Sequence, residues 1–236
     1  MRRLFLSDVH LSPRHPERTA RFMQWLERET PATDELYILG DLFDYWIGPK
    51  HIDLPDYREV LQALRRATAG GLRITFIIGN RDFYMSHGLP EATGVRVADG
   101  RTAERLTLGS AQVHLCHGDY LEGRRDLGFR IQEWIRSPGF ERQFIRLPTF
   151  AAKAMAEFYR WLSGRKTRRA VRLSEEALLA EFRGGTDILI CGHVHEACEE
   201  RRRVDGREKT LYVLGDWSDG ATYLVEEDGR WELRRE

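Results

Sequence analysis

Residues 36–44 read LYILGDLFD, an apolar run that ends in glycine and then a carboxylate. Residues 4–8 (LFLSD) and 74–80 (ITFIIGN) repeat this pattern, with a polar side chain directly after the apolar run. Between these runs, apolar residues recur at helical spacing in residues 16–29 and 57–64. Strands that alternate with helices predict a parallel sheet covered by helices.

After Gly94 the pattern changes to short strands, and Asp205-Gly206 and Asp228-Gly229 are typical of hairpin turns. The later strands are expected at residues 105–108, 112–116, 188–191, 211–214, 222–225 and 231–233. Residues 123–173 interrupt this order with helical patterning. The sequence therefore predicts a mixed α/β sandwich. We expect this sandwich to form a single domain over residues 1–236, with a helical cap inserted at about 123–173.

The charge is distributed unevenly along the chain. The formal net charge is zero, so the protein as a whole is not attracted to nucleic acid. Residues 123–173 nevertheless hold 13 Lys and Arg against 4 Asp and Glu, and eight of the 25 aromatic residues. This stretch could grip an anionic lipid surface and cover acyl chains. A solvated basic helix pair, or attraction of residues 165–172 to nucleic-acid phosphates, are the alternatives. The last is disfavoured because no base-reading motif accompanies it. The aromatic residues expected to line an acyl groove are Trp134, Phe144, Phe150, Phe158 and Trp161.

Three cysteines, Cys116, Cys191 and Cys198, are too few for a disulfide framework and fit a reducing compartment. No run approaches the ~18–20 apolar residues of a membrane span, and the start is too short in apolar residues for a signal peptide. We expect a cytoplasmic protein, or one peripheral on the cytoplasmic face of a membrane.

Residue types that bind metals follow the predicted strands. They are Asp8, His10, Asp41, Asn80, His117, His193 and His195. Residues i and i+2 of an extended segment point the same way, so Asp8 and His10 are expected to aim at one point. Glycine before Asp41, Asn80 and His193 is expected to let the backbone turn sharply. Mixed carboxylate, imidazole and amide ligands suit Mn²⁺, Fe²⁺ or Zn²⁺. Two such ions roughly 3.5–4 Å apart would activate a water for attack on phosphorus.

These motifs, in this order, resemble the calcineurin-like metallophosphoesterase superfamily. The resemblance implies a four-layer αββα sandwich of two mixed sheets. It also implies two metal ions bridged by Asp41. One would be held by Asp8, His10, Asp41 and His195, and the other by Asp41, Asn80, His117 and His193.

One position departs from that superfamily, where histidine usually follows the Gly-Asn and protonates the leaving group. Here the residue is Arg81, whose pKa is too high for it to donate a proton. The substrate should then have a leaving group that is stable as an anion, such as a phosphate. Arg81 would stabilise charge on the phosphoryl oxygens, so the sequence favours pyrophosphate hydrolysis.

Residues 37–43 (YILGDLF) and 79–83 (GNRDF) further resemble the UDP-2,3-diacylglucosamine diphosphatase family of lipid A biosynthesis. That resemblance implies Mn²⁺-dependent cleavage of a UDP-linked diacylated glucosamine to UMP and the acylated sugar 1-phosphate, at the inner-membrane surface and without a stable protein partner. The catalytic residues would be Asn80, Arg81 and His193. The substrate contacts would be Asn80, Arg81, Asp126, Arg160, Ser163, Thr167 and Arg169. Two alternatives stay open: an enzyme for another pyrophosphate or phospholipid headgroup, and a metal-bound scaffold without turnover.

The remaining polar residues have structural interpretations. His114 is expected on the far side of its strand from His117, and His15, His51 and His87 are expected in solvated loops. Asp44 and Asp82 follow the ligand positions closely, and we expect them to orient histidines.

Overall fold

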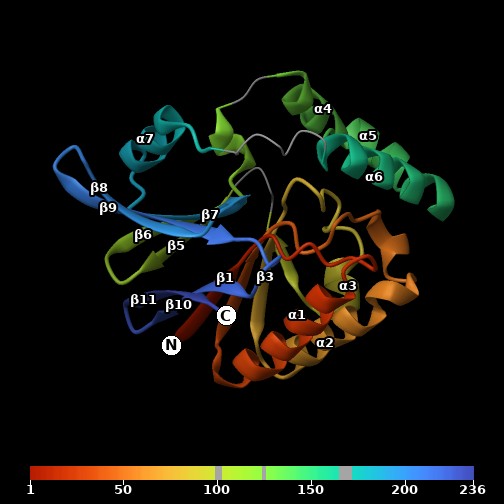
Figure 1. The fold of residues 1–236 in the computed structure, drawn as a ribbon, viewed down its shortest axis with the longest axis horizontal. Coiled ribbons are helices and arrows are strands. Elements are labelled where there is room, and N and C mark those ends of the chain that lie inside the picture. Colours follow the sequence, from red (N-terminus) through yellow and green to blue (C-terminus); the bar gives the residue numbers. More distant parts are fainter. Residues whose placement is uncertain (99–102, 124–125, 165–171) are drawn as a thin grey trace.

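The computed structural model describes residues 1–98, 103–123, 126–164 and 172–236, with the side chains of residues 162–164 outside that description. Its strands form two mixed sheets (Figure 1). The first has the order β11-β10-β1-β2-β3-β4, and the second β5-β6-β7-β9-β8. The strands are β1 (Arg2–Leu6), β2 (Glu35–Leu39), β3 (Arg73–Ile77), β4 (Arg96–Ala98), β5 (Glu104–Leu108), β6 (Ala111–Leu115), β7 (Ile188–His195), β8 (Cys198–Val204), β9 (Arg207–Gly215), β10 (Thr222–Glu227) and β11 (Arg230–Arg235).

Helices cover the outer faces of both sheets. The first three lie against the first sheet and α7 lies against the second, while α4–α6 lie apart over one end of the sandwich (Figure 1). The helices are α1 (Pro16–Glu29), α2 (Arg58–Ala69), α3 (Leu89–Thr93), α4 (Leu127–Ile135), α5 (Pro138–Phe144), α6 (Thr149–Gly164) and α7 (Glu175–Arg183). The part of the chain that the structure describes also holds four short 3₁₀ helices: η1 (Thr30–Ala32), η2 (Gly48–His51), η3 (Pro55–Tyr57) and η4 (Asp119–Glu122).

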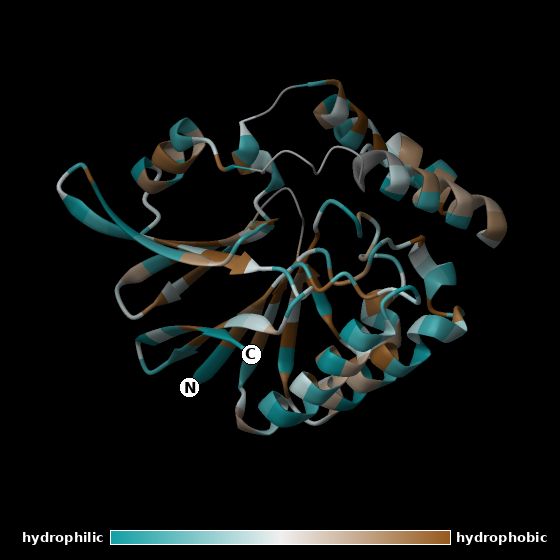
Figure 2. Ribbon diagram, in the orientation of Figure 1, coloured by the Kyte–Doolittle hydropathy of each residue, from teal (hydrophilic) through white to brown (hydrophobic). Residues whose placement is uncertain are grey.

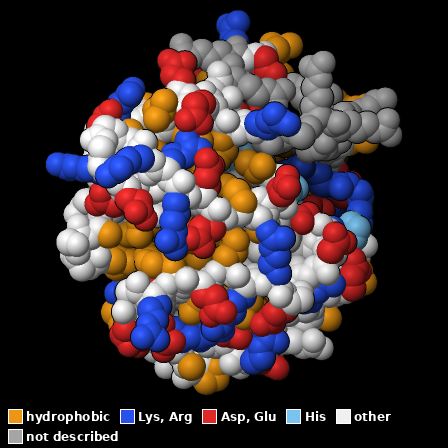
Figure 3. All heavy atoms as spheres, turned by 60° about the vertical axis from the view of Figure 1, so that its left-hand side comes forward, with side chains coloured by type: hydrophobic (Ala, Val, Ile, Leu, Met, Phe, Trp, Pro, Cys, Tyr) orange, Lys and Arg blue, Asp and Glu red, His pale blue; other side chains and the backbone are white. Residues whose placement is uncertain are grey.

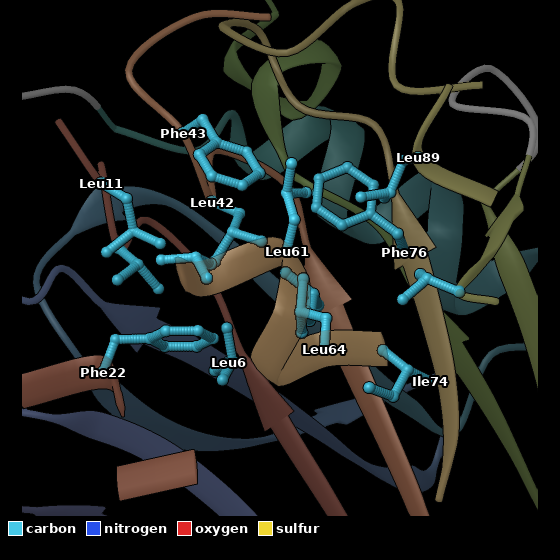
Figure 4. Packing of buried hydrophobic residues seen from close by; sticks show 14 of the residues in the cluster. Leu6, Leu11, Phe22, Leu42, Phe43, Leu61, Leu64, Ile74, Phe76 and Leu89 are labelled. Carbon is cyan, nitrogen blue, oxygen red and sulfur yellow. The ribbon is translucent and has the colours of Figure 1, made fainter. Parts of the chain in front are cut away.

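Successive side chains of β1 point to opposite faces of the sheet and enter two different core clusters. Leu4 and Leu6 pack with Phe22 of α1 and with α2, whereas Phe5 faces the other way, into the cluster between the sheets. Figure 4 shows Leu6 and Phe22 in the first of these clusters. A third cluster joins β7 and β9 to α7. The predicted four-layer αββα arrangement is confirmed.

The predicted hairpin turns are confirmed. Asp205 and Asp228 have φ of 48° and 50°, and the glycine after each also has positive φ, as a two-residue hairpin loop requires. The strands β4 and β8 were not predicted. Strand β8 reads CEERRRV and carries no apolar alternation, because it is an exposed edge strand whose charges discourage pairing with other chains. Figure 3 shows Lys, Arg, Asp and Glu side chains intermixed on the side of the molecule that carries β8 and β9.

The helices α4–α6 come from the stretch predicted to be a cap. They mix apolar and polar residues along their lengths (Figure 2). Phe144 and Ala152 are buried in the same cluster as the residues of α1 and α2, so α5 and α6 are anchored on the main body. No helix within the described residues is long and apolar enough to cross a bilayer.

The prediction for His51 was wrong, because its ring is fully buried rather than solvated. It stacks on Trp46 with ring centroids 4.3 Å apart and lies 4.2 Å from Tyr57. The sequence around it, Gly48-Pro-Lys-His, looks like a polar loop but folds over this aromatic cluster as η2. His114 is buried, and its Nδ1 lies 2.7 Å from Glu181 of α7. Cys116 and Cys191 are buried.

Candidate metal centre

The candidate ligands lie at the carboxyl ends of neighbouring strands, either on the loops that follow them or, for His193 and His195, on the last residues of β7. Five non-glycine residues there have positive φ, between 53° and 70°. They are Asp8, His10, Asp41, His193 and His195. The expectation that Asp8 and His10 converge through an extended backbone was therefore wrong, because each adopts the left-handed conformation. Such backbone is unfavourable for residues other than glycine and gathers at functional sites.

One group of candidate ligands joins the first and seventh strands. Asp8 Oδ1 lies 3.7 Å from His10 Nε2 and 3.4 Å from His195 Nε2. The two histidine nitrogens lie 3.5 Å from each other. Asp8 Oδ1 and His10 Nδ1 are buried without a well-formed hydrogen bond among the described residues. Because a buried carboxylate oxygen without a donor is costly, this arrangement fits a cation between the three side chains.

A second group lies beside it, around Asp41. Asp41 Oδ1 lies 3.7 Å from His117 Nε2, and His117 Nε2 lies 3.2 Å from His193 Nδ1. The other His117 nitrogen, Nδ1, donates to the Leu39 carbonyl at 2.8 Å, which leaves Nε2 free to bind a metal. The amide end of Asn80 lies 2.8 Å from His193 Nδ1. A half-turn of that amide would present its oxygen as a ligand.

The geometry also brings Asp8 within reach of Asp41 and His117. Asp8 is therefore common to both groups, and the bridging role of Asp41 stays a prediction. The charge of Asp41 acts on both His10 and His117, which supports a central position for it.

The electric field of the buried carboxylates favours positive charge. Burial alone would lower the pKa of His117, but Asp41 and Asp8 raise it to about 9. Burial likewise opposes the charge of His195, yet Asp8 raises its pKa. For His10 burial prevails and the pKa is lowered. Burial would raise the pKa of Asp8, but the surrounding imidazoles hold it well below its usual range. The cluster thus attracts cations, as a divalent-metal site must.

Two glycines allow close approach between the loops instead of the sharp turn that was predicted. A Cβ at Gly79 would collide with Asp41 Oδ1, and one at Gly192 would collide with Ser7 Oγ and Asp8 Oδ2. Of the three glycines predicted to allow sharp turns, only Gly40, with φ of 82°, also needs glycine for its backbone conformation.

The prediction for Asp82 was wrong. It is fully buried and accepts hydrogen bonds from the backbone N–H groups of Gly79 (2.9 Å) and Leu42 (3.0 Å), so it ties two loops together rather than orienting a histidine. Burial and the charge of Asp41 raise its pKa to about 7, against the effects of the hydrogen bond from Gly79 and the charge of His117. Asp44 does face a histidine, since its Oδ1 lies 3.9 Å from His10 Nδ1.

The family model of the calcineurin-like phosphoesterases matches residues 1–197. The chain belongs to this family. Calcineurin-like phosphoesterases are metal-dependent, and divalent ions are therefore implied for the cluster described above.

Relatives and a solved structure agree with this assignment. The chain is 33% identical over 244 residues to a UDP-2,3-diacylglucosamine hydrolase of Chromohalobacter salexigens, covering 99% of this chain and 97% of that protein. It is 34% identical over 247 residues to the protein of the same name from Stenotrophomonas maltophilia, covering 99% and 98%. A dimetal phosphatase from Danio rerio shares the fold, with a TM-score of 0.50, 15% identity and coverage of 100% of this chain and 95% of that one.

In this phosphoesterase Arg81 lies between the ligand cluster and an apolar cavity. Its backbone N–H donates to Asp41 Oδ1 at 2.9 Å, and its Nε lies 3.9 Å from Asp41 Oδ2. Its side chain also lines the cavity beneath α4–α6. The Arg81 side chain therefore faces both the candidate metal centre and the apolar cavity.

The predicted substrate contacts are spread more widely. Arg160 of α6 approaches the candidate metal centre, because its Nη1 lies 3.8 Å from Asp44 Oδ2. Asp126 caps α4 by accepting a hydrogen bond from the Phe129 N–H at 3.0 Å, which gives it a structural role. The Ser163 side chain, Thr167 and Arg169 lie outside the described residues.

Sequence reasoning assigned no role to three charged residues beside the centre, which are Asp119, Glu122 and Arg136. Arg136 donates from Nη2 to Asp119 Oδ2 (2.6 Å) and to the Gly79 carbonyl (3.2 Å), so it joins the end of α4 to two ligand loops. Glu122 contacts His193 Nε2. The adjacency of Asp119 to His117 was the one available signal, whereas Arg136 and Glu122 belong to no local pattern.

Proposed function

We propose that this phosphoesterase hydrolyses the pyrophosphate of a UDP-linked diacylated glucosamine to UMP and the acylated sugar 1-phosphate. Relatives that cover almost the full chain are UDP-2,3-diacylglucosamine hydrolases. The observation that carries the proposal is an apolar cavity that adjoins the candidate metal centre through Arg81 and Asp44. A substrate with a diphosphate beside two acyl chains requires that combination.

The cavity has a volume of about 370 Å³ and lies between the main body and α4–α6. Arg81 and Asp44 lie in its lining on the side of the metal centre, and the remaining lining is dominated by aromatic and aliphatic side chains. Of the five residues expected to form an acyl groove, Trp134, Phe144 and Phe158 belong to the lining. Phe150 and Trp161 do not, and are 78% and 51% exposed. Each acyl methylene buried there would contribute roughly 0.8 kcal/mol.

The chemistry follows from the residues around the centre. Asp8, His10, Asp41 and His195 would hold one ion, and Asp41, Asn80, His117 and His193 the other. The ions, Mn²⁺ in our proposal, would supply a water of lowered pKa and polarise a phosphoryl oxygen. Asn80 and His193 would keep the diphosphate aligned, and Arg81 would stabilise the developing negative charge. No side chain needs to protonate the leaving phosphate.

We further propose that residues 123–173 act as a cap that docks on the cytoplasmic face of the inner membrane. Among the described residues, six of the eight exposed large apolar side chains belong to α4 and α6. These six are Leu127, Trp134, Phe150, Met155, Phe158 and Trp161. A basic stretch with exposed aromatic residues favours binding to anionic lipid.

The decisive experiment compares kcat/KM for UDP-2,3-diacylglucosamine, UDP-N-acetylglucosamine and bis(p-nitrophenyl) phosphate, each with Mn²⁺, Mg²⁺ and Zn²⁺. We expect the acylated diphosphate to exceed the other two by at least about 100-fold, with Mn²⁺ the best metal. Equal use of both UDP-sugars would refute the acyl selectivity. An absence of hydrolysis with every substrate and metal would refute the enzymatic function.

Arg160→Gln tests the cap separately. It should raise KM for the acylated substrate several-fold and leave hydrolysis of the small diester unchanged, whereas equal loss on both would reduce the cap to a structural role. Membrane docking is tested by co-sedimentation with vesicles of phosphatidylethanolamine and phosphatidylglycerol. Binding should decrease when Phe150 is replaced by Asp, and unchanged binding would refute this docking surface.

A further inference from the structure

One carboxylate outside the candidate ligand set contacts a ligand directly. Glu122 Oε1 is in hydrogen-bonding contact with His193 Nε2, and the two side chains are only 13% and 10% exposed. The opposite nitrogen, His193 Nδ1, faces Asn80 at 2.8 Å and His117 Nε2 at 3.2 Å. The imidazole is therefore held from behind by Glu122, and only Nδ1 faces the cluster.

This contact determines which nitrogen can bind a metal. A hydrogen bond to the carboxylate requires the proton of the neutral ring on Nε2, which leaves the lone pair of Nδ1 directed at Asn80 and His117. A carboxylate behind a ligating imidazole fixes its rotation and increases its basicity. We propose that Glu122 is a positioning residue that holds His193 ready for the second metal ion. The inference rests on the metal pair of the proposed function.

The alternative is that Glu122 itself binds a metal together with His193 Nε2. An ion between the two atoms would need roughly 2 Å to each of them, and a direct hydrogen-bonding contact leaves no room for it. The geometry thus favours support of His193 over direct ligation.

The backbone that carries Glu122 is fixed by its neighbours. Glu122 ends η4, which lies between Gly118 and Gly123, both with positive φ. Leu121 is fully buried, and its carbonyl accepts a hydrogen bond of 2.7 Å from the Ser174 N–H. Because the turn is anchored at Leu121, Glu122 can hold the ring without first becoming ordered, which is what a positioning residue requires.

The test is calorimetric titration of metal-free protein with Mn²⁺. Glu122→Leu removes the acceptor, and Glu122→Gln keeps the shape of the side chain and one acceptor but removes the charge. Glu59→Gln makes the same change of charge at an exposed position on α2 and is the control. We expect Glu122→Leu to weaken one of two Mn²⁺ sites by about 10- to 100-fold, with a smaller loss for Glu122→Gln and none for the control. At fixed low Mn²⁺ kcat should fall, and added Mn²⁺ should restore it.

Dissociation constants within twofold of the wild type for both Glu122 variants would overturn the proposal. If Glu122→Leu does not fold, Glu122→Gln decides alone, and a change below about threefold overturns it. A wild-type protein that binds only one ion would refute the metal pair of the proposed function. The same titrations would still show whether Glu122 supports that ion, so the two failures remain distinguishable.

Discussion

Replacing His51 by Phe should make the protein less sensitive to acid. The ring of His51 is buried between Trp46 and Tyr57, and neither ring nitrogen has a hydrogen-bond partner among the described residues. Burial, with a smaller effect from the charge of Lys153, lowers its pKa from 6.5 to about 3. As the pH falls, the unfolded chain therefore binds a proton on His51 before the folded chain does. Stability is lost from about pH 6.5 downwards, and the loss is complete near the folded-state value.

The magnitude follows from the two pKa values. At pH 8 both states leave His51 neutral, so it has no effect. At pH 5 the unfolded chain is protonated on His51 and the folded chain is not. Each pH unit below the unfolded-state pKa of 6.5 then costs about 1.4 kcal/mol of stability, so the total at pH 5 is about 2 kcal/mol. Wild-type protein should lose this amount between pH 8 and pH 5 in addition to what other groups contribute, and His51→Phe should not.

The assay is urea unfolding followed by tryptophan fluorescence at both pH values, for wild type, His51→Phe and His15→Phe. The measured quantity is the change in unfolding free energy between pH 8 and pH 5, so an overall cost of fitting the larger ring cancels. His15→Phe makes the same replacement at an exposed position and is the control. If His51→Phe and wild type lose equal stability on acidification, His51 does not resist protonation in the folded state and the reasoning is refuted.

Three shorter predictions concern the metal centre. Asp41→Ala should lower activity by at least ~100-fold while the chain stays folded, and elemental analysis should show fewer ions per chain; retention of two ions at full activity would contradict the assignment. Arg81→His should not improve diphosphate cleavage but should raise activity on p-nitrophenyl phosphate, and faster hydrolysis of monoesters than of diphosphates by the wild type would contradict the argument on the leaving group. Gly192→Ala should push Asp8 aside and destabilise the fold by about 1–3 kcal/mol in urea, whereas Gly139→Ala, with open space around it, should not.

The fold was predictable where local pattern and tertiary environment agree. Leu4, Phe5 and Leu6 form a run that is buried on both faces, because helices cover one side and the second sheet the other. Glycine and carboxylate at the ends of such runs then identified the edge of the sheet where the ligands meet. The charged strand Cys198–Val204 shows no such pattern, because it is the edge strand of its sheet and most of its side chains are exposed to solvent.

The details of the site were harder to predict, because they depend on contacts between distant segments. Glu122 and His193 are 71 residues apart, and neither lies in a repeat that points to the other. The left-handed backbone of Asp8 and His10 is imposed by hydrogen bonds to the Gly40 and Asp41 carbonyls of another loop. Residue types at strand ends therefore indicate which side chains converge, but not the backbone by which they do so.

In the function that we propose, metal binding and substrate selection belong to different parts of this protein. The ligand loops are braced by buried backbone hydrogen bonds and by Asp82, so little movement is available to them. The cavity is instead lined in large part by side chains of α4–α6, two of which, Trp134 and Phe158, are more than half exposed. Arg81 belongs to both parts, and Arg136 ties α4 to the Gly79 carbonyl beside Asn80. If α4–α6 select the substrate as we propose, a change in their packing would reach the bound phosphate through Arg81 and Arg136, while the candidate metal ligands keep their positions.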